Sequence, residues 1–362
     1  MRRRGRSPQL RWLRVLAIGT PLVLMLPVAW IVAYGLAHGR DLPAAWRALR
    51  APAPAPVAAP ASTLPAPFGP ALHVGSLLDP ELVEVSGLAA SRRRPNLLWA
   101  VNDGGNEHRL YALSHTGALL RSFDVAVPED RSSGDSDWEA LAGFAYEGAP
   151  YLLIADVGDN WSWRRSVRLW IVEEPELATA EARLVPRWRI ELVYEGGARD
   201  CEAVAVDEET ATALLISKRT APPVVYAAAL APLLRGVGGQ VVAHPLVALA
   251  GIPPPSTEFA DALARAMLHM PTALDLAPDG SAAVVLSYAA GWRFPRAPGQ
   301  SWAEAFAGRP ERITLPPLPL AEAVAYSGAS LFITGEMEQL ALVRWRAPLM
   351  RLDPLASPEP AR

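Results

Sequence analysis

The sequence predicts an all-β fold: a β-propeller of five four-stranded blades, with room for a degenerate sixth blade inside residues 228–270, preceded by a transmembrane helix and a linker rich in proline and alanine. Three observations support this prediction. A short strand that opens with an acidic or hydroxyl residue recurs five times, an apolar strand follows each copy, and a third strand follows four of them. Four-stranded units that recur in this way are typical of propeller blades. An antiparallel sandwich is the alternative, but it does not predict a repeated strand opening.

The N-terminal residues have the composition of a membrane anchor. Residues 2–14 carry arginines and no acid, and residues 15–37 are an uncharged apolar stretch. A helix of that length, rising about 1.5 Å per residue, spans a hydrocarbon core of about 30 Å. Because basic flanks stay on the cytoplasmic side, we expect residues 1–14 to be a cytoplasmic tail and the main domain to be periplasmic or extracellular. A cleaved signal peptide is the alternative, although its apolar region is normally shorter.

The remaining boundaries follow from composition. Residues 38–72 are the predicted linker, and the prolines between residues 43 and 70 favour an extended conformation without a core. Residues 73–348 are the predicted propeller, and residues 349–362 are predicted to be a disordered tail.

The predicted strands repeat in the same order along the chain. The first strands of the blades are residues 86–89, 139–142, 202–205, 272–275 and 322–325. The second strands are residues 97–100, 152–155, 214–217, 284–287 and 331–334. The third strands are residues 109–113, 167–172, 224–228 and 340–345, and residues 291–306 look like an insertion with a helical turn in the remaining blade. The outer strands are residues 119–125, 187–194, 240–247 and 312–315, with residues 71–78 closing the ring as the outer strand of the last blade.

The repeat places most polar groups on one face of the predicted disc. The first and second strands of a blade are antiparallel, so the start of one and the end of the other lie on the same face. Carboxylate and amide oxygens gathered there suit Ca²⁺ or Mg²⁺, and calcium is the preferred interpretation. The six histidines show no zinc spacing. The candidate metal ligands are Asn102, Asp103, Asp137, Glu139, Asp156, Asp159, Asn160, Asp200 and Glu202.

The same face offers groups for an anionic or polar ligand. Lys218 is the only lysine of the chain and stands at the end of a second strand, where we expect a catalytic or anion-holding role. Unlike arginine, a buried lysine readily loses its charge. The alternative for any single charged residue is structural: an acid at a strand start also pins neighbouring blades together, and loop Asp and Asn favour turns. The other candidate ligand-binding residues are Arg164, Arg219, Tyr288, Glu322 and Glu336.

Several functions lose support from composition. A net charge of −3 gives no basic surface for nucleic acid, so we expect no nucleic-acid partner. The single cysteine, Cys201, excludes an internal disulfide. The motifs of serine hydrolases, nucleotide-binding loops and zinc proteases are absent from the sequence. Trp99, Trp138 and Trp170 occupy apolar strand positions, where we expect them to pack between blades.

Six segments resemble secreted bacterial β-propellers of the esterase-like phytase, SdiA-regulated and calcium-dependent lactonase types. They are SGLAASRRRPNLLWAVNDGG, DWEALAGF, YLLIADVGDN, RDCEAVAVD, LDLAPDG and EAVAYSGASLFITGE, within residues 73–346. The resemblance implies a central divalent cation, usually calcium, and in some members hydrolysis of lactones or phosphoesters. Glu139, Glu202, Asp156 and Asn102 stand where such ligands are expected. Ser86 and Thr272 depart from the pattern by replacing the acid, and the histidine of the lactonases has no obvious counterpart.

Three functions follow as hypotheses. The first is a membrane-anchored extracytoplasmic propeller that binds a divalent cation and a small polar ligand on one face. The second is a metal-dependent hydrolase of a lactone, phosphoester or carboxyl ester, in which Lys218 stabilises developing negative charge. The third is a protein-interaction scaffold, in which the acids only join the blades.

Overall fold

The computed structural model describes the greater part of the predicted propeller. The described residues are 67–128, 136–252, 270–288, 290–316, 318, 320–335, 339–340, 343–344 and 346–355. The predicted cytoplasmic tail, the apolar stretch 15–37 and the linker up to residue 66 lie outside them. Within the described ranges, no helix is long and apolar enough to cross a membrane.

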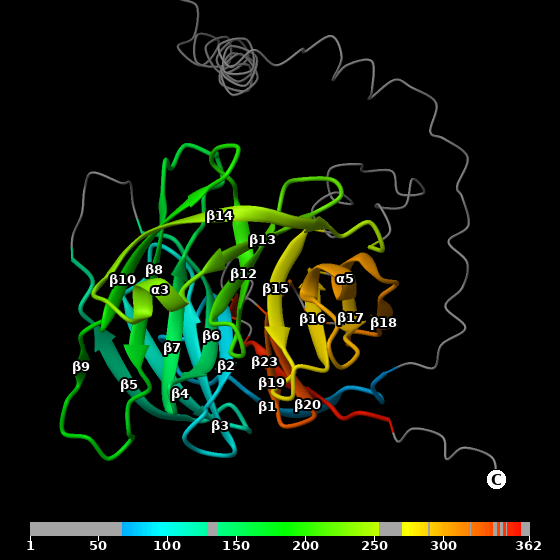
Figure 1. Cartoon of the computed structure of the whole chain (residues 1–362). Helices are drawn as coiled ribbons and strands as arrows, with labels where there is room; N and C mark the ends of the chain where they lie inside the picture. The colour runs from blue at the N-terminus through cyan, green and yellow to red at the C-terminus, as the bar shows by residue number, and fades with distance from the viewer. Residues whose placement is uncertain are drawn as a thin grey trace, which may run out of the picture. The chain divides into compact units, whose positions relative to one another are not determined.

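The described chain folds into successive antiparallel units of four strands (Figure 1). The first unit is β2 (Val85–Ala90), β3 (Leu97–Asn102), β4 (Arg109–Ser114) and β5 (Leu119–Val125), with the short β9 (Arg183–Leu184) parallel to β5. The second unit is β6 (Trp138–Tyr146), β7 (Ala149–Asp156), β8 (Val167–Glu173) and β10 (Trp188–Tyr194). The third unit is β11 (Cys201–Asp207), β12 (Thr212–Ser217), β13 (Val224–Ala229) and β14 (Gly238–Ala248), with α3 (Ala231–Leu234) between the last two.

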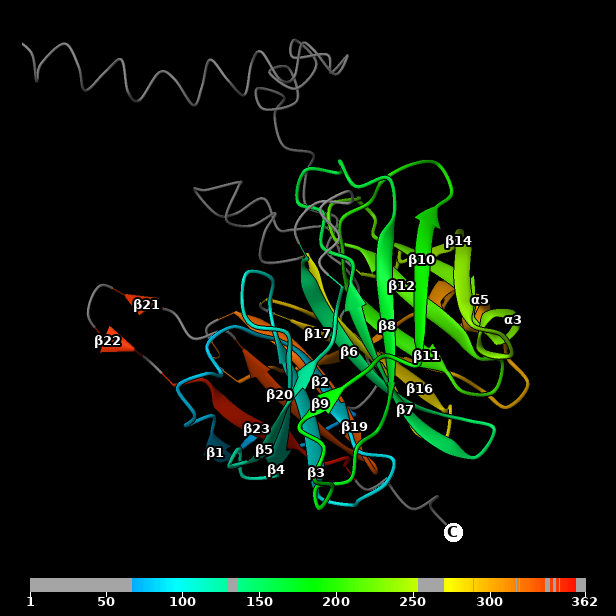
Figure 2. The ribbon, with the colours of Figure 1, turned by 90° about the vertical axis from the view of Figure 1, so that its left-hand side faces the viewer.

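The described residues contain two more units, and residues 253–269, which belong to the stretch predicted to hold a degenerate sixth blade, lie outside them. The fourth unit is β15 (Pro271–Leu276), β16 (Ala282–Ser287), β17 (Gly291–Pro295) and β18 (Glu311–Ile313), with α5 (Trp302–Ala307) before β18. The fifth unit is β19 (Ala321–Ser327), β20 (Ser330–Gly335), β23 (Pro348–Leu352) and β1 (Leu72–Ser76). A separate hairpin of β21 (Gln339–Leu340) and β22 (Val343–Arg344) lies apart from these sheets (Figure 2).

The first strands of the units form a closed ring. β2 contacts β6, β6 contacts β11, β11 contacts β15, β15 contacts β19, and β19 returns to β2. In Figure 1, β2, β6, β15 and β19 lie toward the middle of the domain, and β5, β10 and β18 lie at its periphery. Radial four-stranded sheets around a closed ring of inner strands define a β-propeller, so the prediction of an all-β propeller is confirmed.

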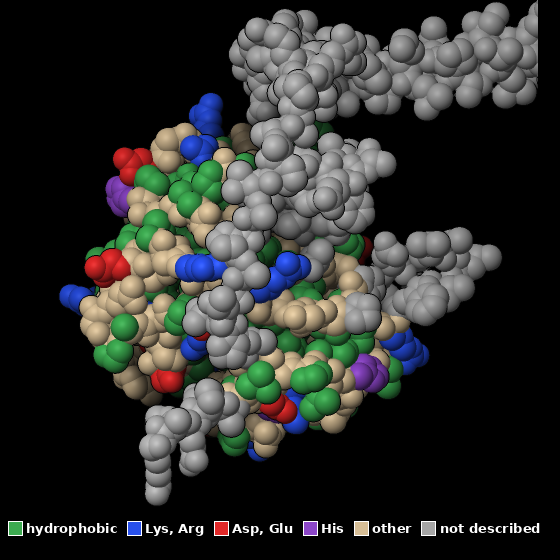
Figure 3. All heavy atoms as spheres, turned by 90° about the vertical axis from the view of Figure 1, so that its right-hand side faces the viewer, with side chains coloured by type: hydrophobic (Ala, Val, Ile, Leu, Met, Phe, Trp, Pro, Cys, Tyr) green, Lys and Arg blue, Asp and Glu red, His purple; other side chains and the backbone are tan. Residues whose placement is uncertain are grey.

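Burial on both faces explains why the inner strands have continuous apolar sequences. Every residue of β3 is buried, because one face of the strand packs on the preceding blade and the other on the next. The predicted packing of Trp99, Trp138 and Trp170 is confirmed, since all three belong to one buried cluster between the first and second units. At the surface, basic and acidic side chains are interspersed on the side shown in Figure 3.

Ring closure agrees with one prediction and corrects two others. β1 pairs antiparallel with β23, so the residues before the first blade supply the outer strand of the last blade as predicted. The third strand of that blade is Pro348–Leu352 and not 340–345, because Leu349 and Leu352 are the residues that reach the core. The predicted tail therefore begins too early: residues 349–355 belong to the folded domain, and 356–362 lie outside the described residues.

Two further features differ from the sequence prediction. Residues 291–295 are a regular third strand and not part of an insertion: Trp292 and Phe294 are buried, but a strand this short with Gly and Pro at its ends shows little periodicity. The helical turn follows it as α5, which Ser301 and Glu304 begin with a capping box. The outer strands β10 and β14 pair in parallel and join the second and third units into one sheet, a long-range contact that no local pattern indicates.

The close approach of neighbouring first strands gives a testable prediction. A Cβ atom on Gly87 of β2 would lie 2.6 Å from the backbone nitrogen of Leu141 in β6. We therefore expect Gly87→Ala to lower the free energy of unfolding by about 1–3 kcal/mol, the usual effect of overpacking, as measured by urea denaturation. Gly69→Ala is the control, because its Cβ would meet only ordinary contacts. Equal stability of the two variants would contradict the packing described for β2 and β6.

Candidate functional site

A β-bulge interrupts every first strand at the same place. In β6, Trp138 pairs with Asp156 and Ala140 with Ala155, so Glu139 between them has no partner on β7. Bulges re-aim a side chain and are common beside functional sites. The five bulge residues are Ser86, Glu139, Glu202, Thr272 and Glu322, and all are buried. The predicted strand starts are therefore equivalent positions, on the face where the first strands begin. We call this the acidic face.

Two of the five bulge residues join neighbouring blades. The Ser86 hydroxyl donates a hydrogen bond of 2.9 Å to the carbonyl of Trp138, the residue before the next bulge residue. The Thr272 hydroxyl donates one of 2.7 Å to the equivalent carbonyl, that of Ala321. A hydroxyl can donate this bond and an ionised carboxylate cannot. The replacement of the acid by Ser86 and Thr272 therefore has a structural reason.

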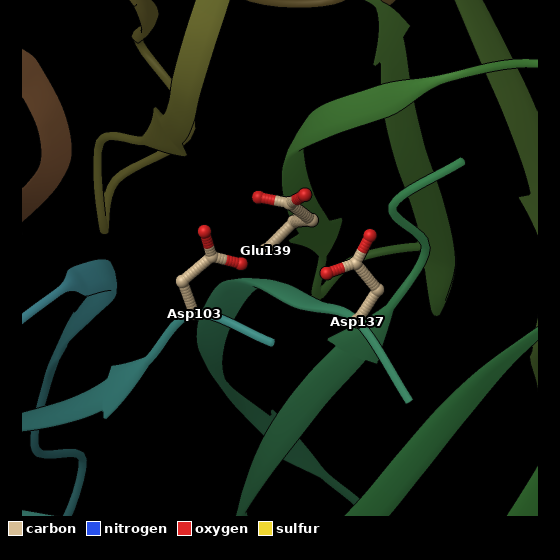
Figure 4. A group of neighbouring side chains, drawn as sticks. All are labelled: Asp103, Asp137 and Glu139. Atoms are coloured by element: carbon tan, nitrogen blue, oxygen red, sulfur yellow. The ribbon is translucent and has the colours of Figure 1, made fainter. Parts of the chain in front are cut away.

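Glu139 belongs to a group of three carboxylates (Figure 4). Asp103 follows β3, Asp137 precedes β6, and Glu139 is the bulge residue of β6. One oxygen from each lies within 4.8 Å of the oxygens of the other two. Figure 4 shows the three side chains converging from these two neighbouring blades. A hard divalent cation takes this kind of oxygen donor set.

Two glycines allow the backbone to close around this group. A Cβ atom on Gly104 would lie 2.1 Å from a carboxylate oxygen of Asp137. A Cβ atom on Gly158 would lie 2.3 Å from the other Asp137 oxygen and 2.5 Å from a Glu139 oxygen. Sequence reasoning missed both glycines, although each lies next to or within two residues of an acid in the loop that follows a second strand.

Burial and mutual repulsion oppose the ionisation of the group. Burial, and then the nearby charges of Asp103 and Asp137, raise the pKa of Glu139 well above its usual value. Burial is also the main cause that raises the pKa of Asp137, which Arg164 opposes from a distance. Among the described residues, no ion pair joins the side chain of either Asp137 or Glu139 to a basic residue. The two carboxylates are therefore costly to ionise unless a cation is present.

Most other predicted metal ligands already have cationic or backbone partners. Asp156 is fully buried, 2.8 Å from Nη2 of Arg164 and 3.5 Å from Nη1 of Arg168. The Asp159 carboxylate accepts backbone hydrogen bonds of 2.8 and 2.9 Å from Trp163 and Arg164, which closes its own loop.

Asp200 and Asn160 also lie outside the carboxylate group. Asp200 pairs with Arg219, which also donates to the Asn160 side chain. The predicted ligand-binding arginines Arg164 and Arg219 thus neutralise acids of the acidic face. The Nδ2 atom of Asn102 donates to the carbonyl of Glu81, and its Oδ1 is buried without a hydrogen-bond partner among the described residues.

Lys218 forms a second polar group on the acidic face. Its Nζ pairs with Glu202, donates a 2.9 Å hydrogen bond to the hydroxyl of Tyr288, and is buried. Lys218 and Tyr288, which the sequence analysis placed on the same face, are therefore in contact there. Glu322 is buried at the bulge of β19. Glu336 lies outside the described residues.

Comparisons with known proteins add only a distant similarity of fold. No protein-family model matches the sequence, and the search of curated proteins found no match. A nidogen/laminin complex shares 12% identity over 72% of this chain and 74% of that chain, with a TM-score of 0.37. Kuenenia stuttgartiensis hydrazine synthase shares 12% identity over 74% and 61%, with a TM-score of 0.33. The β-propeller domain of Myceliophteria thermophila Cps50 (Swd1) shares 12% identity over 79% and 74%, with a TM-score of 0.33. Similarity at this level says nothing about a ligand or a reaction, and the fold assignment depends on the strand topology.

The raised pKa of Glu139 predicts a pH-dependent stability difference. The pKa of such a carboxyl is higher in the folded than in the unfolded protein. While the group is protonated in both states it does not change the free energy of unfolding. As pH rises from the unfolded-state pKa through the folded-state pKa, the group lowers the free energy of unfolding. In EDTA, Glu139→Gln should therefore be more stable than the parent, by a margin that grows from pH 5 to pH 8. Urea unfolding at each pH measures the margin.

The control for this experiment is Glu181→Gln, which changes an exposed carboxyl. Comparing variant with parent cancels the opposite contribution of His108 and His115, whose pKa values burial lowers. A margin for Glu139→Gln that is constant or shrinks as pH rises would contradict the described electrostatics.

Proposed function

We propose that the chain is a five-bladed β-propeller that binds a divalent cation, preferably calcium, through Asp103, Asp137 and Glu139. One observation carries the proposal: three carboxylates from two blades converge within 4.8 Å, and neither Asp137 nor Glu139 has an ion pair with a described basic residue. Other acids of the acidic face are instead neutralised by basic side chains. Asp156, Asp200 and Glu202 each have a cationic partner.

The donor set favours calcium over zinc. Calcium accepts six to eight oxygen ligands in variable geometry, whereas zinc prefers nitrogen and sulfur ligands. Three carboxylates leave several positions for water or for oxygens of a small polar ligand. Lys218 and Arg219, on the same face, would attract an anionic part of such a ligand. We further propose that residues 15–37 anchor the chain with its main domain outside the cytoplasm.

A metal-dependent hydrolase of a lactone, phosphoester or carboxyl ester is the second candidate. The observation that favours it is the buried Lys218, held 2.9 Å from the Tyr288 hydroxyl on the face that carries the carboxylate group. A buried cation of this kind would stabilise negative charge that develops on a substrate oxygen. Calcium-dependent release of product from a panel of these esters would distinguish a hydrolase from a binding protein. A scaffold role remains if calcium has no effect at all.

The cation proposal predicts opposite effects of one substitution in the presence and absence of calcium. In EDTA, Glu139→Gln and Asp137→Asn should each raise Tm, because each removes a carboxylate that repels its neighbours, from a buried position at Glu139 and a half-buried one at Asp137. With calcium, the parent should gain several degrees, since a ligand at 100 times its Kd adds about 2.7 kcal/mol of stability, and 1 kcal/mol shifts Tm of a domain by about 2–4 °C. Both variants should lose most of that gain. Differential scanning calorimetry of the full chain measures each shift.

Glu322→Gln is the matched control, since Glu322 is buried at the equivalent bulge of another blade. It should keep the calcium-dependent gain. A parent that shows no gain with calcium would refute the cation site. So would variants that lose stability in EDTA yet keep the gain, because those carboxylates would then be structural only.

The membrane proposal predicts the distribution of the chain in a bacterial host. The full chain should stay with the membrane fraction after a carbonate wash, and a variant without residues 1–37 should be released. Mass spectrometry of the recovered protein reports whether residues 1–37 are retained. A soluble full chain, or a membrane-free product that lacks these residues, would contradict a retained anchor.

A further inference from the structure

A polar cavity lies on the face opposite the acidic face. Its volume is about 510 Å³, within the range of small-molecule sites. It is lined by the turns β2–β3, β4–β5, β15–β16 and β19–β20, together with β20 and β23. Three of these turns, β2–β3, β15–β16 and β19–β20, follow the ends of first strands, and β4–β5 follows the end of a third strand, which runs parallel to the first. The carboxylate group lies instead at the starts of first strands. The cavity is therefore separate from the proposed cation site.

The charge of this cavity is opposite to that of the carboxylate group. Arg92 and Arg351 are the charged residues of its lining, which contains no aspartate or glutamate. The Ser327 hydroxyl adds a further hydrogen-bonding group to the lining. A guanidinium group matches the oxygens of a phosphate or carboxylate with paired donors. The lining thus has the chemistry of an oxyanion site.

A buried carboxylate holds the Arg92 side of the cavity in place. Glu174, 1% exposed, accepts hydrogen bonds from the Ser91 hydroxyl and from the backbone nitrogens of Arg92 (2.9 Å) and Arg93 (3.2 Å). The β2–β3 turn therefore wraps around an acid that belongs to the next blade. The Nε of Arg92 donates to Glu208 at 2.7 Å. This leaves its two terminal nitrogens without a hydrogen bond to another described residue.

The Arg351 side of the cavity carries an unused donor. Nη2 of Arg351 lies 3.0 Å from Asp353, whereas its Nε is buried and has no acceptor among the described residues. His115 is a further residue of the lining. The centroids of its ring and of the Phe332 ring lie 4.2 Å apart, and its Nε2 lies 3.2 Å from the Ser327 hydroxyl oxygen. Burial and the charge of Arg351 lower the pKa of His115, so its ring is neutral at pH 7 and offers both a donor and an acceptor.

We propose that this cavity binds a small organic oxyanion, a molecule whose phosphate or carboxylate group lies between Arg92 and Arg351. An anion there would bind Nη1 of Arg351 and the terminal nitrogens of Arg92, none of which has a hydrogen bond to another described residue. The rest of the ligand would occupy the remaining volume, which exceeds the needs of an inorganic ion. The carboxylates of Glu174, Glu208 and Asp353 lie outside the lining and hold the surrounding turns and arginines.

Isothermal titration calorimetry of the full chain in EDTA tests this site without the cation site. The probes are glucose 6-phosphate, glucuronate, inorganic phosphate and uncharged glucose. We expect saturable binding of at least one of the two organic anions, weaker binding of phosphate, and none of glucose. Arg351→Gln and Arg92→Gln should each weaken binding at least tenfold, the effect expected for loss of a charge-assisted hydrogen bond. Asp353→Asn should bind more tightly, because it removes the carboxylate that competes for Arg351.

Two control variants separate the site from general effects. Arg235→Gln removes a positive charge from the exposed C-terminal end of α3, outside the cavity lining, and Glu139→Gln alters only the acidic face. Both should bind like the parent. The proposal is overturned if neither organic anion binds at 10 mM. It is also overturned if folded Arg351→Gln and Arg92→Gln variants keep the parent affinity, or if glucose binds as well as its charged derivatives.

Discussion

The β-bulge at the start of each first strand is the constraint on which the acidic face depends. The bulge releases one residue from pairing with the second strand, and the closed ring of first strands gives the five such residues of the described chain equivalent backbone positions. The identity of the residue then decides its use. A hydroxyl joins its blade to the next one, as Ser86 does, whereas a glutamate brings a buried charge that needs a partner.

The buried carboxylates of the acidic face are balanced in different ways. Glu202 is neutralised by Lys218, and Asp156 by two arginines of its own blade. Between the first two blades, Asp137 and Glu139 meet Asp103 instead of a cation, and two glycines let the surrounding backbone close on them. A folded domain that keeps such repulsion sacrifices stability, which is the usual situation of a site that binds a charged ligand. On the opposite face the charges are exchanged: arginines line the cavity, and the carboxylates that contact these arginines lie outside its lining.

The sequence predicted the fold and the face of the site better than the contacts within it. The repeat of short strands is a local pattern, and the antiparallel geometry of a blade converts it into the common location of Asp103, Asp137 and Glu139. Which acids pair with arginines depends on the directions of side chains in the loops, and the sequence does not show these directions. Asp156 and Glu139 occupy similar places in the repeat, but Asp156 pairs with Arg164 whereas Glu139 is buried beside other acids. The third strand of the last blade was misplaced because residues 340–345 alternate as well as Pro348–Leu352 does, and only the core decides between them. The pairing of β10 with β14 and the arginine cavity depend on residues far apart in the chain.

The central claim is that Asp103, Asp137 and Glu139 form one cation site. Anomalous diffraction from a crystal of the protein soaked in Mn²⁺, with a second crystal in Ca²⁺, tests it most directly. The account predicts a single strong peak among the three carboxylates, with ligand distances of 2.3–2.6 Å for calcium. Ordered carboxylates with no peak between them at millimolar cation, or a peak elsewhere on the domain, would contradict it.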